Sequence, residues 1–188
     1  PNWRLDLNSG ALMVGAGIAY DYTNRDSDEF SPLIKLEWQP LAAPIRVRLD
    51  YLGTTQVAGY TALKSAPSGL FGGNASLGRE KSKQWSLSIE RDVTDGALSA
   101  SFFARRDKDA VDWTYDRSRP FTRQANSVDL DVQGIELLWD QEWGKISSVL
   151  GATFIDKKSD YSATNVDASY YALNYAKQRF TAAVRWRL

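Results

Sequence analysis

Two groups of acidic residues have the composition of a metal site built from oxygen ligands. The first group comprises Asp26, Asp28 and Glu29. The second comprises Asp107, Asp109, Asp112 and Asp116. Ca²⁺ takes several carboxylate and carbonyl oxygens, so both groups raise the hypothesis of a calcium site. Charge runs of this kind are more often solvated loop surface, and we prefer that interpretation for both.

Catalytic chemistry is restricted because the sequence contains neither histidine nor cysteine. Imidazole acid–base catalysis, His-ligated zinc, thiolate chemistry and disulfides are therefore excluded. A Ser–Lys or paired-carboxylate site remains formally possible, with Glu136 as the carboxylate to inspect first. A charge paired with a neighbouring arginine is the simpler role for Glu136. We expect a protein that is not an enzyme and needs no cofactor.

Arginines and loop aromatics are the residues that we expect to meet a ligand. The arginines are Arg46, Arg48, Arg105 and Arg179. They could attract an anionic solute or dock another domain, or they could equally pair with Glu37, Asp50 and Glu90. The aromatics are Tyr60, Trp113 and Tyr115, together with Phe71 and Phe121 in the same loops. They could contact a bulky ligand or pack the loops on one another.

The segments that must position these residues alternate in polarity with a period of two, which predicts strands. We predict nine of them: 3–7, 11–22, 33–38, 45–51, 83–91, 98–106, 128–140, 145–156 and 176–188. Their connections alternate between short and long, the longest being 53–80, 107–127 and 157–175. This order predicts an antiparallel meander of the kind that forms outer-membrane barrels.

Each predicted strand has one apolar and one polar face. In 45–51, for example, Ile45, Val47 and Leu49 alternate with Arg46 and Arg48. Two like charges on one face cannot lie in a dry core, so the polar face must be wet. Since no amphipathic helix is available to cover the apolar face, a second sheet or lipid must do so.

Two further patterns refine this prediction. In 128–140 the apolar positions change from even to odd at Gln133-Gly134, which predicts a β-bulge there. Aromatic residues lie at both ends of the apolar faces, as in the girdles at the two interfaces of a bilayer. One row comprises Trp38, Trp139 and Trp186, and the other comprises Tyr20, Tyr22, Tyr51 and Trp85.

Several motifs resemble those of TonB-dependent outer-membrane transporters. Gly73, Asn74, Leu77, Glu80 and Ser82 match that family's loop-to-strand segment, and the run 80–85 looks like its cobalamin (vitamin B12) branch. Asn126 followed by Val132-Gln133-Gly134-Ile135-Glu136 is similar to a later strand of the family, and Ala176-Lys177-Gln178-Arg179 fits its basic approach to the next strand.

The resemblance implies energy-coupled uptake of a metal chelate, such as cobalamin or a ferric siderophore, across the bacterial outer membrane. It implies a 22-stranded barrel closed by a plug domain that meets TonB. Residues 1–188 would then be one incomplete barrel domain, from the C-terminal half and without its plug. The expected partners are membrane lipid, the plug, TonB and the chelate.

Other functions remain as alternatives at this point. With 23 basic and 23 acidic residues the chain carries no net charge, so nucleic-acid binding is not expected. A passive porin-like barrel would lack the coupling to TonB. A soluble β-sandwich with ligand-binding loops would cover the apolar faces with a second sheet.

Overall fold

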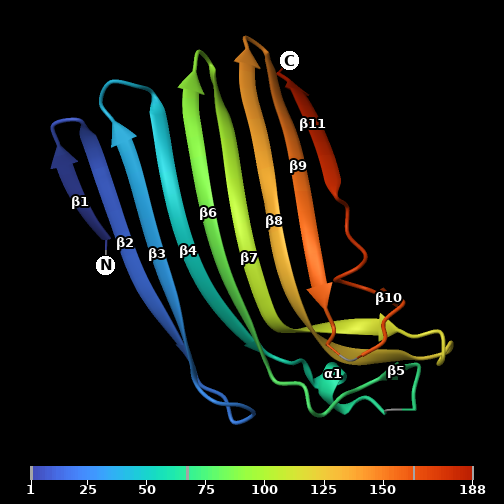
Figure 1. Cartoon of the computed structure of the whole chain (residues 1–188). Helices are drawn as coiled ribbons and strands as arrows, with labels where there is room; N and C mark the ends of the chain where they lie inside the picture. The colour runs from blue at the N-terminus through green and yellow to red at the C-terminus, as the bar shows by residue number, and fades with distance from the viewer. Residues whose placement is uncertain (1, 67, 163, 188) are drawn as a thin grey trace.

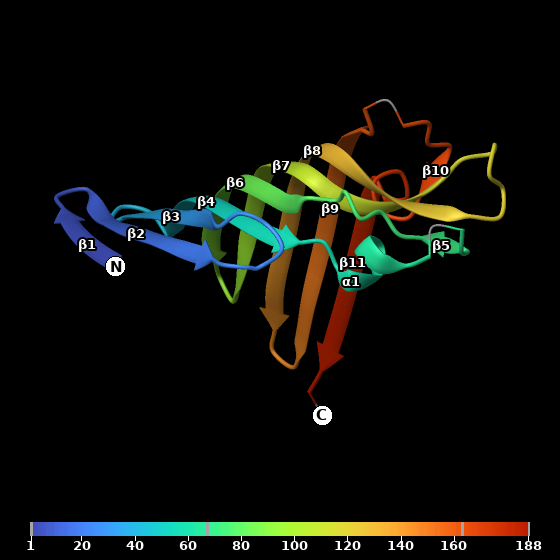
Figure 2. The same ribbon diagram turned by 90° about the horizontal axis from the view of Figure 1, so that it is seen from below.

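The computed structural model describes residues 2–66, 68–162 and 164–187. They form a curved antiparallel sheet in which strand neighbours in sequence are neighbours in space (Figures 1 and 2). Nine strands follow this path: β1 (Asn2–Leu7), β2 (Gly10–Asp21), β3 (Glu29–Pro40), β4 (Ile45–Val57), β6 (Arg79–Val93), β7 (Gly96–Tyr115), β8 (Arg123–Trp143), β9 (Ile146–Asp160) and β11 (Gln178–Trp186). The predicted meander of nine strands is confirmed.

The remaining elements lie in the long connections. They are the helix α1 (Tyr60–Lys64) and the two-residue strands β5 (Phe71–Gly72) and β10 (Ala168–Ser169). Among the described residues, no helix has the length and apolar character needed to cross a membrane. The tight turns gather at one end of the sheet and the long connections at the other (Figure 1). This is the predicted alternation.

The apolar residues of successive strands lie opposite one another on one face of the sheet. Leu87 pairs with Leu49 on β4 and with Phe102 on β7, and the row continues to Ile135 and Phe154. These side chains are bare: Phe102 is 48% exposed. Because the described residues contain a single sheet and one short helix, the soluble β-sandwich alternative is wrong. We call this side the outer face and the opposite, charged side the inner face.

Aromatic residues border the outer face at both ends. At the end with the long connections, Tyr20 stacks near Phe30, Tyr51 near Trp85 and Phe154 near Phe180, with ring centroids 4.9, 4.6 and 5.7 Å apart. At the other end, Trp139 lies edge-on to Trp143 at 5.7 Å. The two rows thus lie at opposite ends of the apolar face, the arrangement of the aromatic girdles of membrane barrels.

Strands β7 and β8 are much longer than the alternation predicts. The expected loop 107–127 is wrong, because only residues 116–122 turn and the rest is a hairpin that extends beyond the aromatic row (Figure 1). On β8 the outer face of this extension is polar, with Asp131, Asp129 and Ser127, so the hydrophobic period of β8 changes before the strand ends. The last strand ends at Trp186, and Leu188 lies outside the described residues.

The change of phase in β8 does not come from a bulge at Gln133-Gly134. The register of β8 with β7 and β9 runs through this point, and the irregularity falls in β7 between Asp107 and Ala110. Asp109, with φ of 55°, absorbs the extra residue. Gly134 has a different role: a Cβ there would come within 2.5 Å of the Phe103 ring, so glycine allows that ring to lie on the strand.

The even-numbered apolar residues of β8 instead line a small core on the inner face. Val128, Leu130 and Val132 are buried with Ala110 and Ala172, and Phe103, Ile155 and Tyr161 pack against them. The connection between β9 and β11 supplies Ala172 and covers this core. Where β8 runs beyond the aromatic row, its inner face is therefore buried, whereas nearer the tight turns its outer face carries the apolar residues.

The apolar character of the outer face leads to a prediction that can be tested in the full-length protein. Leu87→Arg places a charge among apolar side chains at mid-strand, which costs about 2–4 kcal/mol where that face meets lipid. The matched variant Ser86→Arg puts the same group on the wet inner face and is expected to cost little. Unfolding in lipid vesicles with guanidinium measures both. Equal destabilisation would show that the outer face does not contact lipid.

Candidate functional site

The inner face carries paired charges near the tight turns. The Glu37 carboxylate lies 3.5 Å from Lys35 Nζ, 3.6 Å from Arg46 Nε and 3.3 Å from Arg48 Nε. Arg46 also contacts Glu90, at 2.8 Å. Of the two roles considered for Arg46 and Arg48, the structure therefore shows pairing, since their charges already meet carboxylates.

A hollow of about 450 Å³ opens on the inner face toward the end with the long connections; we call it the inner hollow. Its lining residues come from β4, β6 and β7, and from the connection after β9. They are Thr54, Thr55, Gln56, Glu80, Lys81, Ser82, Arg105, Asp107, Lys108, Ala110, Val111 and Tyr171. Most of them carry groups that donate or accept hydrogen bonds, which suits a polar solute.

Arg105 is the predicted site residue that lines the inner hollow. Its Nη2 donates a hydrogen bond to the Tyr171 hydroxyl at 3.0 Å. Its Nε lies 3.0 Å from Asp107 Oδ2, an ion pair without hydrogen-bond alignment, so this N–H has no hydrogen-bond partner among the described residues. Asp107 accepts instead from Ser82 Oγ, at 2.6 Å. Because the Nε–H is buried against the carboxylate, the group that can donate to an acceptor in the hollow is Nη1, which makes no hydrogen bond to the described residues.

Lys157 lies behind Arg105 and was missed by sequence reasoning. Its Nζ is 4.5 Å from the ring centre of Tyr171 and 4.7 Å from that of Tyr175, within cation–π distance of both. Burial lowers the pKa of Lys157, and the nearby charge of Arg105 lowers it further. Two features of the sequence could have indicated this cluster of Lys157 and tyrosines. Lys157 directly follows the apolar run of β9, and Tyr170, Tyr171 and Tyr175 lie close together in the sequence.

Asp112 anchors the segment that closes over this side, residues 164–175, which we call the strap. The carboxylate is 1% exposed and accepts hydrogen bonds from Tyr161 Oη (2.8 Å) and from the backbone N–H groups of Tyr171 (3.0 Å) and Ala172 (2.8 Å). Burial, followed by the bond to Asp112, raises the pKa of Tyr161. Asp112 thus has a structural role, and the structure does not gather it with Asp107, Asp109 and Asp116 into a site.

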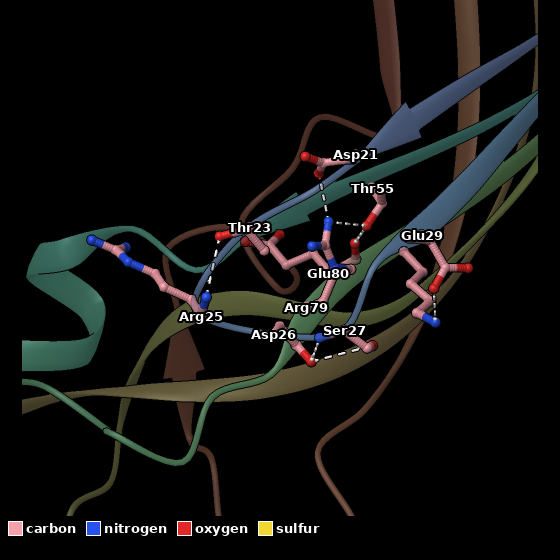
Figure 3. A network of polar contacts seen from close by, with 10 residues as sticks. Asp21, Thr23, Arg25, Asp26, Ser27, Glu29, Thr55, Arg79 and Glu80 are labelled. Carbon is pink, nitrogen blue, oxygen red and sulfur yellow. Dashed lines mark hydrogen bonds and ion pairs between the residues drawn. The ribbon is translucent and has the colours of Figure 1, made fainter.

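The other acidic group is also divided among separate partners (Figure 3). Asp26 accepts from the backbone of Ser27, Asp28 accepts from the Tyr20 hydroxyl, and Glu29 pairs with Lys81. The bond from Ser27 is the main cause that lowers the pKa of Asp26. Across the described residues no group of three or more acidic side chains is placed to hold a metal ion.

Arg79 connects the β2–β3 connection to β6 (Figure 3). Its side chain is 1% exposed, and its Nη1 contacts the Asp21 carboxylate and lies 3.3 Å from Thr55 Oγ1. Its Nε and Nη2 are buried without a hydrogen-bond partner among the described residues. Arg79 is thus a buried cation held mainly by one ion pair, and its neighbour Thr55 lines the inner hollow.

The remaining predicted site residues are dispersed. Trp113 and Tyr115 line a second, smaller hollow on the β7–β8 hairpin. Tyr60, at the start of α1, is 69% exposed and borders a third hollow with Arg25 and Leu63. Arg179 is exposed on β11, opposite Thr153. The seven residues therefore do not form one site, and Arg105 alone among them lies at the inner hollow.

The last two aromatics and the carboxylate Glu136 have simpler surroundings. Phe71 packs edge-on against Trp113, with ring centroids 5.4 Å apart, so loop packing is its observed contact. Phe121 is 84% exposed in the turn of the hairpin. Glu136 is exposed on the inner face, opposite Ser101 and Thr153, and no bulge adjoins it.

Comparison with known proteins identifies the class to which this sheet belongs. Residues 2–188 match the family profile described as TonB dependent receptor-like, beta-barrel, and the chain belongs to that family. No curated protein sequence matches the chain.

Two solved structures share the fold. The FrpB iron transporter from Neisseria meningitidis (F3-3 variant) is 16% identical, with a TM-score of 0.62 over 100% of this chain and 30% of the transporter. The alcaligin outer membrane receptor FauA from Bordetella pertussis is 18% identical, with a TM-score of 0.59 over 98% of this chain and 33% of the receptor. The chain spans about a third of the length of these proteins, and likeness at this identity shows the fold alone.

The strap anchor can be tested in the full-length receptor. Asp112→Ala removes the acceptor of three buried donors, and hydrogen bonds to a charged group contribute about 1.5–3 kcal/mol each. We expect amide hydrogen exchange in the strap to accelerate by at least about 100-fold. The control Asp131→Ala removes a carboxylate on the same hairpin whose pair with Arg106 is 63% exposed on both sides. Unchanged exchange in Asp112→Ala would contradict the anchoring role.

Glu80 gives the inner hollow a dependence on pH. Burial raises the pKa of Glu80, and the charge of Asp107 raises it further, although the Val111 backbone N–H opposes both. The ionised form is therefore disfavoured in the folded protein above the raised pKa, and this cost disappears as the pH falls through it.

Glu80→Gln should accordingly raise the midpoint of guanidinium unfolding at neutral pH, and this gain should vanish below the pKa of Glu80. The comparison variant Glu90→Gln loses the contact with Arg46 and should show no gain at neutral pH. A stabilisation by Glu80→Gln that persists at acid pH would exclude ionisation of Glu80 as its cause.

Proposed function

We propose that the chain forms part of the barrel wall of a TonB-dependent transporter that takes up a metal chelate across the bacterial outer membrane. The observation that carries the proposal is the family match over residues 2–188, on a sheet whose outer face is bare and apolar. Ferric chelates are the first class to test, because one structural neighbour is named as an iron transporter. Cobalamin remains the second class, from the resemblance of residues 80–85.

The inner hollow is where this wall would meet the solute. Lys81, Arg105 and Lys108 line it against Glu80 and Asp107, with Lys157 just behind. Within the described part of the chain Arg105 Nη1 makes no hydrogen bond, and the Tyr171 ring provides a flat apolar surface beside this guanidinium group. Cationic donors next to an aromatic ring suit a bulky ligand with acidic oxygens. This supports binding of the chelate as it passes from the loops into the barrel.

We base the division of labour on a wall that has neither histidine nor cysteine. The barrel segment shapes the lumen and the long connections capture the ligand, while a plug domain elsewhere in the receptor opens the path. Energy would reach the plug through TonB at the inner membrane. No covalent step is required, since the ligand crosses the membrane unchanged.

The test uses the full-length receptor in cells that lack their own copy. Arg105→Ala should weaken binding of a radiolabelled ferric chelate by about 10- to 100-fold, because a hydrogen bond to a charged group contributes about 1.5–3 kcal/mol. Arg106→Ala, which removes an exposed arginine of the neighbouring position, should bind as the wild type does.

Deletion of TonB distinguishes this proposal from the passive barrel. Uptake should stop while binding at the cell surface persists, because only the coupled step is lost. Uptake that continues without TonB would identify a porin-like barrel. Failure of every ferric chelate together with TonB-dependent uptake of cobalamin would retain the class of transporter and change its substrate.

A further inference from the structure

The β7–β8 hairpin carries a second hollow on the side opposite the inner one. The register of β8 is continuous, so Arg123 and Ala125 lie on the same face as Ile135 and Leu137, which is the outer face. Trp113 is paired with Ala125 and shares that face, whereas the buried Asp112 lies on the other. The hollow, which we call the outer hollow, has a volume of about 210 Å³. It is lined by Trp113, Tyr115, Arg123, Ala168, Ser169, Tyr170 and Asn174.

Its aromatic walls are fixed by backbone pairing at both edges of the hairpin. β10 pairs with β7, and the Tyr170 N–H donates to the Trp113 carbonyl at 3.1 Å. β5 pairs with the far edge of β8, which brings Phe71 edge-on against Trp113 at an interplanar angle of 90°. The rings are therefore held in place before any ligand arrives, which lowers the entropic cost of binding.

Polar groups stand beside these rings. The Arg123 guanidinium lies 4.5 Å above the centre of the Tyr115 ring. Its Nη1 donates to the Thr122 carbonyl at 3.2 Å, and its other N–H groups have no hydrogen-bond partner among the described residues. Asn174 is exposed at the rim with its amide available. The outer hollow thus combines apolar ring faces with a planar cationic donor and an amide.

This combination matches one sugar ring. The C–H face of a pyranose packs on an aromatic ring, while its hydroxyl groups exchange hydrogen bonds with amides and guanidinium groups. A volume of about 210 Å³ is below the roughly 300–1,000 Å³ of sites for drug-sized ligands, so it suits a single ring better than a whole chelate. The guanidinium fork adds a preference for a carboxylate or phosphate group on that ring.

We propose that the outer hollow binds one acidic sugar unit, a pyranose that carries a carboxylate or a phosphate. The site faces away from the lumen, so it is distinct from the path of the transported solute. Ala104 lies opposite Trp85 in the aromatic row, and the strand from Ala104 to Trp113 is at most about 30 Å long when extended. Such a unit could come from a glycolipid headgroup around the barrel or from a soluble saccharide.

The first experiment titrates the purified full-length receptor with glucose 1-phosphate, and measures binding by calorimetry and saturation-transfer NMR. Arg123→Gln and Tyr170→Ala should each weaken binding by about tenfold or more. Arg119→Gln removes the same charge from the exposed turn of the hairpin and should bind as the wild type does. Hydrogen exchange in the strap should be unchanged in all three, which separates lost binding from lost structure.

Three results would overturn the proposal. Glucose 1-phosphate does not bind, or it binds equally to wild type and Arg123→Gln, or inorganic phosphate alone competes with it at the same concentration. The last result would identify a simple anion site without sugar recognition. This test does not measure chelate uptake, so its result can be interpreted even if the transport proposal is wrong.

A second experiment identifies the source of the sugar. The receptor is placed in nanodiscs that contain either phospholipid alone or added lipopolysaccharide, and the free core oligosaccharide is titrated in parallel. Arg123-dependent protection of the hairpin in the lipopolysaccharide discs alone would indicate the glycolipid. Arg123-dependent binding of the free oligosaccharide, without added protection in the discs, would indicate a soluble saccharide. If neither depends on Arg123, the site does not recognise a natural acidic saccharide and the proposal fails.

Discussion

The structure depends on one constraint: a strand that presents a bare apolar face must make its backbone hydrogen bonds with neighbouring strands, so that side chains alone cover that face. Nine strands in unbroken sequence order satisfy this requirement along the described sheet. Once the ladder is fixed, the alternation of side chains separates the two environments. Leu87 and its cross-strand neighbours lie on the bare apolar outer face, while Glu37 and its three cations lie on the inner face.

The aromatic rows mark where that constraint ends, and the architecture changes there. Beyond them water is available on the outer face, so the dry side moves to the inner face under the strap. The inner hollow lies beside this dry core, and burial accounts for the altered proton affinities of Glu80 and Lys157. The groups that we propose to meet the solute therefore lie at the boundary between the two regimes.

The same boundary explains what could be predicted from the sequence. Val47 and Leu87 lie in segments of strict alternation, so the strands and the apolar outer face could be predicted from the local sequence, and short motifs indicated the family. The prediction of a bulge at Gly134 was wrong. The apolar positions change from even to odd in the same way whether a bulge intervenes or the buried side of the strand moves to the other face. Asp112 and Lys157 gave little signal, since their partners come from a connection distant in sequence and not from their own strands.

The crossing of the two connections over the β7–β8 hairpin has an evolutionary consequence. β5 arrives from the β6 side and joins β8, whereas β10 arrives from the β9 side and joins β7. The hairpin, the connection that carries β5 and the connection that carries β10 are therefore paired with one another, so a change of length in one alters how the other two pack. Sequence divergence in this region should then proceed by coordinated replacement of all three, with the exposed tip at 116–122 free to vary alone.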